Sequence, residues 1–555
     1  MKIALAQMEV KPAQPEKNLE TMLEMIEQAK KQKVDVVAFP EMCLGGYLIG
    51  DKFLDDDFCA DLMEYNEDLA KASVGITIIY GNIYVDKNIN TRWEDNAIHP
   101  NKDGRTRKYN AAYIYHNGKP VERANNNNIL PQGVQPKTLL PNYRFFDDER
   151  YFFSAKDIAT DAGVDLNALM QPFLIKVGDK RIPISINLCE DMWCEDYRLN
   201  RKSQNIAQYH IQNGAQAIIN ISASPWTYGK HHARDRRVQF LAKNCSPFVP
   251  YFYINCVGAQ NNGKNIITFD GGSTIYNNDG LPVKTITESY TQDLLVIDLE
   301  EVNGAPITTR TEKKKIAQKY DAMIRGLRHL PDMIGTDTYP LVVNGMSGGV
   351  DSDVSSALLV DAFGIGHVLG LNLPTEYNSE QTKQSAAYTA SKLGIKILTV
   401  PISTIVNANQ ETLQEYVFNK LGIKLHSNAK DVTDQNIQAK IRGTNILSNV
   451  AGAYHALFIN NGNKLETALG YATLYGDVGG AIAVLGDLTK TEVFEMARYI
   501  NNEVHHDEII PWTLIPDELF RFDNGKIAPS AELKEKQIDP MRFGYHDALL
   551  EALTN

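Results

Sequence analysis

One run of six residues, Ser347-Gly348-Gly349-Val350-Asp351-Ser352, constrains the fold of this chain more than any other stretch. It follows the apolar residues 341–343 and precedes a segment in which Val354, Leu358 and Leu359 recur at helical spacing on one face. This order predicts a strand, a glycine-rich loop and a helix. Two adjacent glycines let the backbone turn tightly and approach a ligand, and a helix N-terminus favours phosphate oxygens. The run therefore predicts a nucleotide-phosphate site.

The other side chains of the run add to this prediction. Ser347 and Ser352 can donate hydroxyl hydrogens, and Asp351 places a carboxylate beside the phosphates, where it would suit Mg²⁺. The run lacks the lysine of a Walker loop. It resembles instead the signature of the ATP pyrophosphatases, which cleave ATP to AMP and pyrophosphate. The alternative is a Gly-Gly turn before a helix that binds no ligand.

Length and charge narrow the class of protein. The 555 residues exceed one ordinary domain and indicate at least two. The 68 acidic residues outnumber the 56 basic ones, for a net charge of -12, which argues against a nucleic-acid partner. No apolar run is long enough to span a membrane, and Gln7 and Glu9 interrupt the first one, which argues against a signal peptide. We expect a cytoplasmic protein with no membrane partner.

The six cysteines all lie in the first half of the chain. Their spacing does not suit a zinc site, and the chain is too long for a small disulfide-bonded secreted protein. Most are therefore expected to be buried apolar residues, and one is a candidate nucleophile. We expect Cys43 and Cys194 to be structural, and His231-His232 to be an exposed loop pair.

The first half predicts alternating strands and helices. Helical spacing of apolar residues predicts a helix over 19–29. Apolar runs predict strands at 3–7, 34–39, 76–84, 111–115, 182–188, 217–221 and 294–299. Glu41, Cys189 and Ser224 follow three of these strands, and Lys137 lies in a loop. Strand ends are where layered α/β folds place their chemistry, so these four residues could converge on one pocket.

Three stretches of the first half carry a resemblance: Phe39-Pro40-Glu41, Lys137 ahead of Leu140-Pro141-Asn142-Tyr143, and Cys189-Glu190-Asp191-Met192-Trp193. They resemble the nitrilase superfamily, and more narrowly its glutamine-hydrolysing amidase domains. The resemblance implies a four-layer α-β-β-α sandwich and a catalytic triad of Glu41, Lys137 and Cys189. The chemistry agrees, because a carboxylate can take the proton of a thiol nucleophile and an ammonium can stabilise an oxyanion.

The same resemblance implies a glutamine site. The residues expected to hold the substrate are Tyr143, Glu190, Ser224 and Lys230. At the position of Lys230 the family often has Arg.

After the glycine-rich run, strands at 367–373 and 396–402 flank a helix over 381–393. This alternation predicts a doubly wound parallel sheet, a Rossmann-like α/β fold of the adenine nucleotide alpha hydrolase type. The adenine pocket is expected at the strand ends near Leu373-Pro374.

A series of motifs continues to the end of the chain, at 435–443, 463–466, 470–477, 489–493 and 529–533. The series resembles NAD synthetases, so nearly the whole chain resembles the glutamine-dependent NAD synthetase family. The resemblance implies Mg²⁺ at Asp351 and Glu466, and a deamido-NAD site with Asn436, Arg442, Glu466 and Asp477. It implies ATP contacts at Gly345, Met346, Ser347, Gly348, Gly349, Val350, Asp351, Ser352, Asn461, Lys490 and Ser530. Asn461 stands where the family has Thr.

The implied reaction is the ATP-dependent amidation of deamido-NAD⁺ to NAD⁺ through an adenylated intermediate. L-glutamine supplies the ammonia, and AMP, pyrophosphate and glutamate are the other products. We expect an amidase domain over 1–300, a linker over 301–317 and a synthetase domain over 318–555. An internal ammonia passage and a homo-oligomer are expected as well. Two alternatives stay open: another ligase with the same loop, such as one that aminates a purine nucleotide, or an amidase with a nucleotide-sensing domain.

Overall fold

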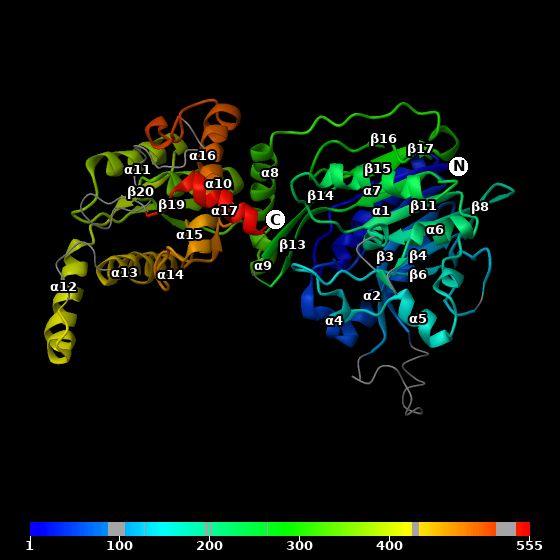
Figure 1. Ribbon diagram of the computed structural model, residues 1–555, viewed down its shortest axis with the longest axis horizontal. Coiled ribbons are helices and arrows are strands. Elements are labelled where there is room, and N and C mark those ends of the chain that lie inside the picture. The colour runs from blue at the N-terminus through cyan, green and yellow to red at the C-terminus, as the bar shows by residue number, and fades with distance from the viewer. Residues whose placement is uncertain are drawn as a thin grey trace. The chain divides into compact units, whose positions relative to one another are not determined.

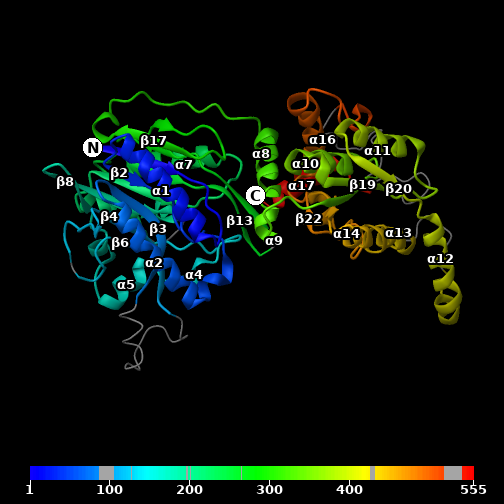
Figure 2. The ribbon, with the colours of Figure 1, turned by 180° about the vertical axis from the view of Figure 1, so that it is seen from behind.

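The computed structural model describes residues 1–86, 106–126, 128–194, 198–199, 202–263, 265–424, 432–517 and 540–554. The chain forms two compact units, Met1–Glu312 and Lys313–Asn555. The first runs from blue to green in Figures 1 and 2, and the second from green to red. Within the described ranges, no helix is long and apolar enough to cross a membrane.

Two sheets form the centre of the first unit. One has the order β17-β1-β2-β3-β4-β5, with β6 beside β4. Its strands are β17 (Asp293–Asp298), β1 (Lys2–Gln7), β2 (Val36–Ala38), β3 (Thr77–Val85), β4 (Lys108–His116), β5 (Lys119–Pro120) and β6 (Val134–Pro136). The other has the order β16-β15-β12-β11-β8-β7. Its strands are β16 (Pro282–Thr285), β15 (Thr274–Tyr276), β12 (Tyr251–Asn255), β11 (Ala217–Ser222), β8 (Lys180–Leu188) and β7 (Phe173–Val177). A two-stranded pair, β13 (Val257–Asn262) and β14 (Asn265–Asp270), extends from them.

The two sheets pack face to face, and helices cover their outer faces. Residues that alternate along the strands fill the inner layer, among them Leu5 on β1 and Ile219 on β11. The alternate residues face helices α1 (Pro15–Lys31) and α2 (Asp56–Ala72) on one side. On the other side they face α5 (Ala155–Ala162), α6 (Ile206–Gln212) and α7 (Lys230–Asn244). The predicted four-layer sandwich is confirmed, and each fully buried aliphatic side chain contributes about 1.5–3 kcal/mol to it.

Strand β1 lies between β17 and β2 in the first sheet. It pairs parallel with β2 and antiparallel with β17, with Lys2 opposite Asp298. The amino group of Met1 lies 3.8 Å from the Asp298 carboxylate. The first and last strands of this unit are therefore neighbours in the sheet.

The second unit contains one sheet with the order β20-β19-β18-β21-β22. Its strands are β20 (Lys396–Thr399), β19 (Val368–Asn372), β18 (Val342–Gly345), β21 (Leu457–Asn460) and β22 (Ile482–Ala483), and all neighbours are parallel. The chain order reverses between β18 and β21, which is where doubly wound sheets bind ligands. The predicted doubly wound parallel sheet is confirmed.

Helix α10 (Val350–Phe363) is buried on more sides than the single apolar face that its sequence pattern predicts. All its residues except Val360 and Asp361 are buried. Helices α8 (Lys315–Leu327), α11 (Glu380–Leu393) and α16 (Lys490–Tyr499) pack against it, in addition to the sheet. The helix that follows the glycine-rich loop is therefore central to this unit and has no solvent face of its own.

Glycine 81 on β3 lets the chain segment that carries Glu41 lie against this strand. Gly81 N donates to Pro40 O at 3.0 Å, and Cys43 N donates to Gly81 O at 3.1 Å. A Cβ atom on Gly81 would lie 2.3 Å from Met42 N and 2.6 Å from the Glu41 Cα. Both neighbours are backbone atoms, so a side chain here has to displace Glu41 itself.

We expect Gly81→Ala to destabilise the first unit by about 1–3 kcal/mol, the usual cost of overpacking, and to displace Glu41. Calorimetric unfolding of the full chain measures the first effect. Gly304→Ala is the control, because its Cβ would meet nothing closer than Glu301 O at 3.8 Å. Equal unfolding temperatures for the two variants would contradict the expectation.

Candidate functional site

The structure brings Glu41, Lys137 and Cys189 together in the first unit. Glu41 lies beyond the end of β2, Lys137 follows β6, and Cys189 follows β8. The Lys137 ammonium lies 2.8 Å from Glu41 Oε1, and both side chains are fully buried. Burial raises the pKa of the Cys189 thiol well above its usual range, the Glu41 carboxylate raises it further, and the Lys137 ammonium lowers it. The resting thiol is therefore protonated at neutral pH, and it needs a base to become a nucleophile.

Cys189 occupies a strained turn that points it away from its strand. Its φ is 38°, a left-handed value that costs a non-glycine residue about 1–3 kcal/mol. The Asp191 carboxylate stabilises this turn by accepting from Leu188 N at 3.1 Å. It also accepts from the backbone of Thr138 at 3.0 Å and Leu139 at 2.8 Å. Asp191 thus ties the cysteine turn to the loop that carries the lysine.

A second carboxylate on Lys137 was not predicted. Asp148 Oδ2 lies 3.0 Å from the ammonium, and Tyr47 donates its hydroxyl hydrogen to Asp148 Oδ1 at 2.7 Å. Burial lowers the pKa of Lys137, but the carboxylates of Asp148 and Glu41 raise it well above its usual value. Asp148 belongs to the acidic run 147–149, which is typical of an exposed surface, so no local signal marks it.

Both oxygens of Glu41 accept hydrogen bonds in addition to the ion pair. Asn110 Nδ2 donates to Oε1 at 2.7 Å, and the backbone N–H of Ala223 donates to Oε2 at 2.9 Å. Ala223 lies at the end of β11, so Glu41 is held from both sheets. Neither Asn110 nor Ala223 was singled out in the sequence.

Three of the four residues expected to hold glutamine surround Cys189. The hydroxyl of Tyr143 donates to Glu190 at 3.2 Å. The Lys230 ammonium lies 4.8 Å from the centre of the Trp193 ring. Burial lowers the pKa of Lys230, Arg234 lowers it further, and Cys189 and Glu190 raise it. The fourth residue, Ser224, is buried one position beyond Ala223, and its N–H donates to Asn255 Oδ1 at 2.8 Å.

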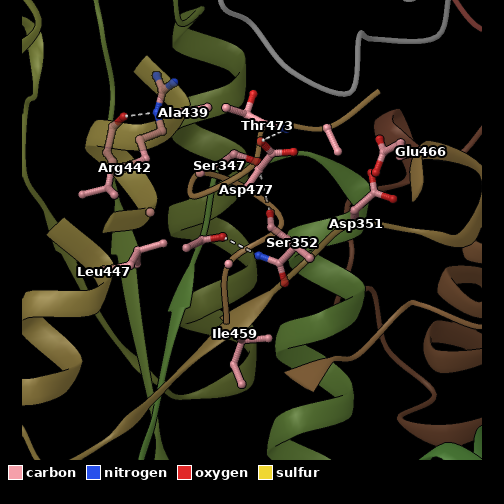
Figure 3. Close-up of a pocket in the computed structure, with 18 of the residues that line it drawn as sticks. Ser347, Asp351, Ser352, Ala439, Arg442, Leu447, Ile459, Glu466, Thr473 and Asp477 are labelled. Carbon is pink, nitrogen blue, oxygen red and sulfur yellow. Dashed lines mark hydrogen bonds between the residues drawn. The ribbon is translucent and has the colours of Figure 1, made fainter. Parts of the chain in front are cut away.

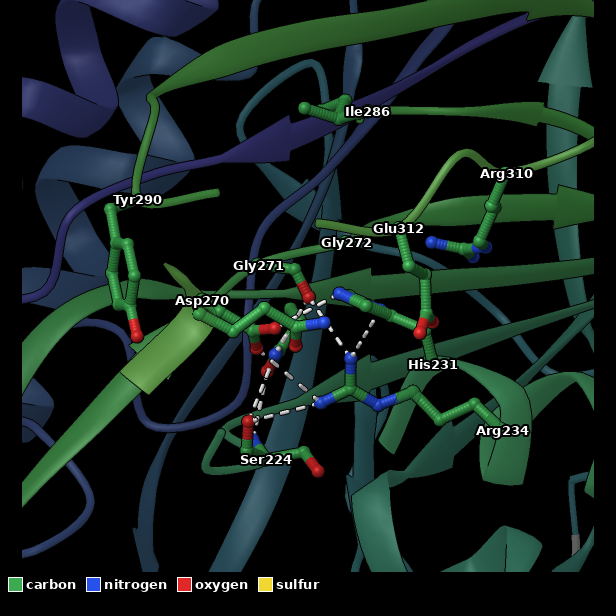
Figure 4. Close-up of polar contacts among 12 residues, drawn as sticks. Ser224, His231, Arg234, Asp270, Gly271, Gly272, Ile286, Tyr290, Arg310 and Glu312 are labelled. Carbon is green, nitrogen blue, oxygen red and sulfur yellow. Dashed lines mark hydrogen bonds and ion pairs between the residues drawn. The ribbon is translucent and has the colours of Figure 1, made fainter. Parts of the chain in front are cut away.

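The prediction that His231-His232 is an exposed loop pair is wrong about the loop and about the exposure of His231, whereas His232 is exposed. Both residues lie in the first turn of α7, which begins at Lys230. His231 is only 18% exposed, and its Nε2 lies 3.0 Å from the Asp270 carboxylate (Figure 4). His232 Nε2 lies 3.2 Å from Glu312. The five cysteines other than Cys189 are buried, Cys43 and Cys194 among them.

The second unit contains a cavity of about 390 Å³ at the carboxyl ends of β18, β19 and β21. Ten residues with predicted nucleotide contacts line it: Gly345, Met346, Ser347, Asp351, Ser352, Asn436, Arg442, Asn461, Glu466 and Asp477. Leu373, near the expected adenine pocket, also lines it. Gly348, Gly349, Val350 and Lys490 do not line it. Ser530 lies outside the described residues.

The polar groups of this cavity are unevenly distributed. Arg442 lies on one side, and Asp351 and Glu466 lie together on the other (Figure 3). Arg442 Nε donates to Leu373 O at 3.1 Å, and burial lowers the pKa of its guanidinium to about 10, so it remains a cation at neutral pH. Thr473 was not predicted, and it joins two expected contacts. Its hydroxyl donates to Asn436 at 2.7 Å, and its N–H donates to Asp477 at 2.8 Å.

Asp351 has a lysine partner that is remote in the sequence. Lys490, the first residue of α16, forms an ion pair with Asp351 Oδ2, and its side chain is 2% exposed. Asn463 Nδ2 donates to Asp351 Oδ1 at 3.0 Å. Because 139 residues separate Lys490 from Asp351, no local pattern predicts the pair.

The side-chain amide of Asn461 donates its hydrogen bond to the protein backbone. Its Nδ2 donates to Gly345 O at 2.9 Å, which joins the end of β21 to the end of β18. Its Oδ1 is buried and has no hydrogen-bond partner in the part of the chain that the structure describes. The group left to meet a ligand is therefore an acceptor, whereas the family's threonine offers a hydroxyl that can also donate.

The glycine-rich loop depends on Gly348. Its φ is 83°, and a Cβ atom there would lie 1.9 Å from Thr382 O. The loop can follow this path only because the position has no side chain.

The residues present fit Mg²⁺. Asp351 and Glu466 both line the cavity, and carboxylate oxygens are the protein ligands that Mg²⁺ prefers. Among the described residues, no group of three or more acidic, histidine or cysteine side chains is placed to hold a metal. The protein would therefore supply two carboxylates, and phosphate oxygens and water would complete the shell, as is usual for Mg²⁺ at nucleotide sites.

Comparisons with known proteins agree with this two-part arrangement. Residues 2–303 match the carbon-nitrogen hydrolase family, and residues 325–554 match NAD synthase. A glutamine-dependent NAD(+) synthetase of Synechocystis is 29% identical over 99% of this chain and 87% of its own length. One of Xylella fastidiosa is 30% identical over 97% of this chain and 85% of its own. The solved structure of glutamine-dependent NAD+ synthetase from Acinetobacter baumannii, in complex with ADP, has a TM-score of 0.74 at 27% identity and covers 93% of this chain and 85% of its own.

We expect Lys137→Met to slow alkylation of Cys189 by iodoacetamide at every pH at which the protein is folded. The ammonium lowers the pKa of the thiol, so its loss raises that pKa and lowers the thiolate fraction. The rate should rise with pH in both proteins, and the profile of the variant should lie at higher pH. Mass spectrometry of the Cys189 peptide measures the rate.

The control is Lys71→Met, whose ammonium is 72% exposed and pairs with Asp68. Removal of Lys137 leaves two buried carboxylates without their cation, which costs about 3–5 kcal/mol of stability, so alkylation is compared below the melting temperature of the variant. An unchanged rate and pH profile would exclude Lys137 as the partner of the thiol.

Proposed function

We propose, from the premise that this chain belongs to the glutamine-dependent NAD(+) synthetase family, that it converts deamido-NAD⁺ to NAD⁺ with ATP and with ammonia released from glutamine. One observation supports this most strongly. A single chain combines the buried Glu41–Lys137–Cys189 constellation with a nucleotide cavity at the switch point of a parallel sheet. In this proposal residues 1–300 form the amidase domain, 301–317 the linker and 318–555 the synthetase domain.

The amidase reaction uses Glu41 as the base. Glu41 takes the proton of the Cys189 thiol as the sulfur attacks the side-chain carbonyl carbon of glutamine. The Lys137 ammonium stabilises the negative oxygen of the tetrahedral intermediate. The C–N bond then breaks, and ammonia leaves with the proton from Glu41. A water molecule, deprotonated by Glu41, hydrolyses the thioester, which releases glutamate and restores the thiol.

The substrate in this reaction would be held by Tyr143, Glu190, Ser224 and Lys230. The negative charge of Glu190 suits the α-amino group of glutamine, and the ammonium of Lys230 suits its α-carboxylate. The contact between Tyr143 and Glu190 supports this assignment, because it brings Tyr143 to the turn that carries Cys189 and Glu190.

The synthetase reaction takes place in the cavity of the second unit. Phosphate oxygens would be bound at the N-terminus of α10, with Ser347 and Ser352, which both line the cavity, as hydroxyl donors. The nicotinate carboxylate of deamido-NAD⁺ attacks the α-phosphorus of ATP, and pyrophosphate leaves. Ammonia then attacks the carbonyl carbon of the adenylate, and AMP leaves. Asn436, Arg442 and Asp477 would contact the dinucleotide.

Asp351 and Glu466 would hold Mg²⁺, which supplies positive charge to the triphosphate when bound. Asp351 forms an ion pair with Lys490, so this lysine lies beside the metal site and would serve as its fixed cation. Asn461 would meet the nucleotide through its free Oδ1.

The two alternatives differ from this proposal in their acceptors and products. A ligase for a purine nucleotide would use xanthosine monophosphate in place of deamido-NAD⁺. An amidase with a sensing domain would release no AMP at all. A glutamine-fed assay for NAD⁺ and AMP, with each acceptor in turn, separates the three. A cytoplasmic location and a homo-oligomeric assembly with an ammonia passage belong to the same proposal.

We expect Cys189→Ala to lose glutamine-driven NAD⁺ synthesis by about 10³-fold or more, as is typical for a catalytic nucleophile. Ammonia-driven synthesis should stay within several-fold, because the second unit needs only free NH₃. Ammonium chloride at alkaline pH supplies it. Cys194→Ala is the matched control, since that cysteine is buried in the hydrophobic cluster formed with α5, α6 and α7. Loss of both activities in a folded Cys189→Ala protein would contradict the division of labour.

We expect Asp351→Asn to lose synthesis with either nitrogen donor, because it removes a carboxylate from the metal site. It should leave glutamate release by the first unit in place. Asp361→Asn is the control, since this carboxylate lies on the same helix and pairs with Tyr320 and His505. Near-normal synthesis by Asp351→Asn at ordinary Mg²⁺ concentration would exclude the metal role.

A further inference from the structure

Arg234 joins two loops behind the amidase site. This residue of α7 is 1% exposed. Its guanidinium donates to Ser224 O at 3.2 Å and to Gly271 O at 3.2 Å, and it lies 3.9 Å from the Asp270 carboxylate (Figure 4). Asn255 Nδ2 donates to the same two carbonyl oxygens, each at 3.0 Å. The end of β11 and the turn after β14 are therefore held together through α7.

The end of β11 and the first residue of α7 are both part of the proposed glutamine site. Ala223, beside Ser224, donates its N–H to Glu41 at 2.9 Å. Lys230 begins α7 and lies close enough to Cys189 and Glu190 for both to raise the pKa of its ammonium. A displacement of α7 would therefore move Lys230 directly and Ser224 through Arg234.

Residues 308–312, which belong to the expected linker, also contact α7. We call these residues the strap. Thr308 anchors the strap to β16, because its N–H donates to Pro282 O at 2.8 Å and its hydroxyl donates to Val283 O at 2.7 Å. Glu312 at the end of the strap lies 3.2 Å from His232 on α7.

Arg310 makes the central contact of the strap. Its Nε lies 3.5 Å from Asp235 on α7, and its Nη2 donates to the hydroxyl of Thr274 on β15. The two side chains of this ion pair are 7% and 15% exposed, so the pair is largely shielded from water. Removing one partner of a shielded pair is costly, because it leaves the other charge buried and unpaired. Arg310 thus joins α7 to the strand that continues from the turn held by Arg234.

We propose that the strap is a positioning element of the amidase site, and that Arg310 holds α7 where Lys230 and Ser224 can bind glutamine. This inference rests on the proposed glutamine chemistry. The strap contacts none of the triad residues, so its effect is on substrate binding rather than on the thiol. The strap is continuous with Lys313, the first residue of the second unit. A displacement of the chain at Lys313 would move the strap, and through the strap it would move α7 and the residues of the proposed glutamine site.

The test compares Arg310→Met with the native full-length chain in a glutamate-release assay. The expected result is a rise of about tenfold in the KM for glutamine, with kcat within about threefold. Alkylation of Cys189 by iodoacetamide should keep its rate and pH profile, and ammonia-driven synthesis should be unchanged. Arg310→Lys should recover part of the KM, because it keeps a cation beside Asp235. Arg181→Met is the control, an arginine 62% exposed in an ion pair of the same unit.

Asp235→Asn removes the same ion pair with a smaller change of side-chain shape. It replaces Arg310→Met in the assay if that variant does not fold. It should also raise the KM for glutamine. The KM of the double variant should not exceed that of the single variant with the higher KM. An unchanged KM in both single variants overturns the proposal. So does a fall in kcat and alkylation rate that matches the rise in KM, because that pattern indicates general destabilisation. If the native chain releases no glutamate, the proposed function itself is wrong, and the positioning role of the strap with it.

Discussion

The first unit depends on one buried cation. The ammonium of Lys137 lies within 3.0 Å of two carboxylates that are themselves buried, Glu41 and Asp148. Charges without water are stable only when they are paired and hydrogen-bonded. Loops that follow separate strands must therefore meet at one point, and the sandwich places them there. In the same environment, burial and the Glu41 carboxylate raise the pKa of the Cys189 thiol, and the Lys137 ammonium lowers it.

The second unit handles charge in a different way. Its cavity has the Arg442 guanidinium on one side and the Asp351 and Glu466 carboxylates on the other, Asp477 also lines it, and Asp351 is paired with Lys490. Helix α10 supports the glycine-rich loop from a position surrounded by three helices and the sheet. A loop on so buried a helix can keep the close path that Gly348 permits.

Much of this arrangement could be predicted from the sequence, since apolar runs and polar residues at strand ends are local features. The convergence of Glu41, Lys137 and Cys189 was predicted on that basis, whereas their roles as a triad and most of the nucleotide contacts were implied only by the resemblance to known families. Asp148 could not be, because an acidic run is usually exposed, and neither could the pairing of Lys490 with Asp351, because it is long-range. The His231-His232 pair was misplaced because the helix start at Lys230 has no side-chain cap. The burial of α10 on every side also depends on partners distant in the chain.

The pairing of β1 with β17 has a consequence for how the protein is made. During synthesis, strand β1 finds its antiparallel partner only when Asp293–Asp298 has emerged from the ribosome. At roughly 5–20 residues per second, nearly three hundred residues take about 15–60 s to synthesise. During that interval one edge of β1 is open, and an open edge can pair with a strand of another nascent chain. Polysomes that crowd several copies of this chain together are where such pairing would be most frequent.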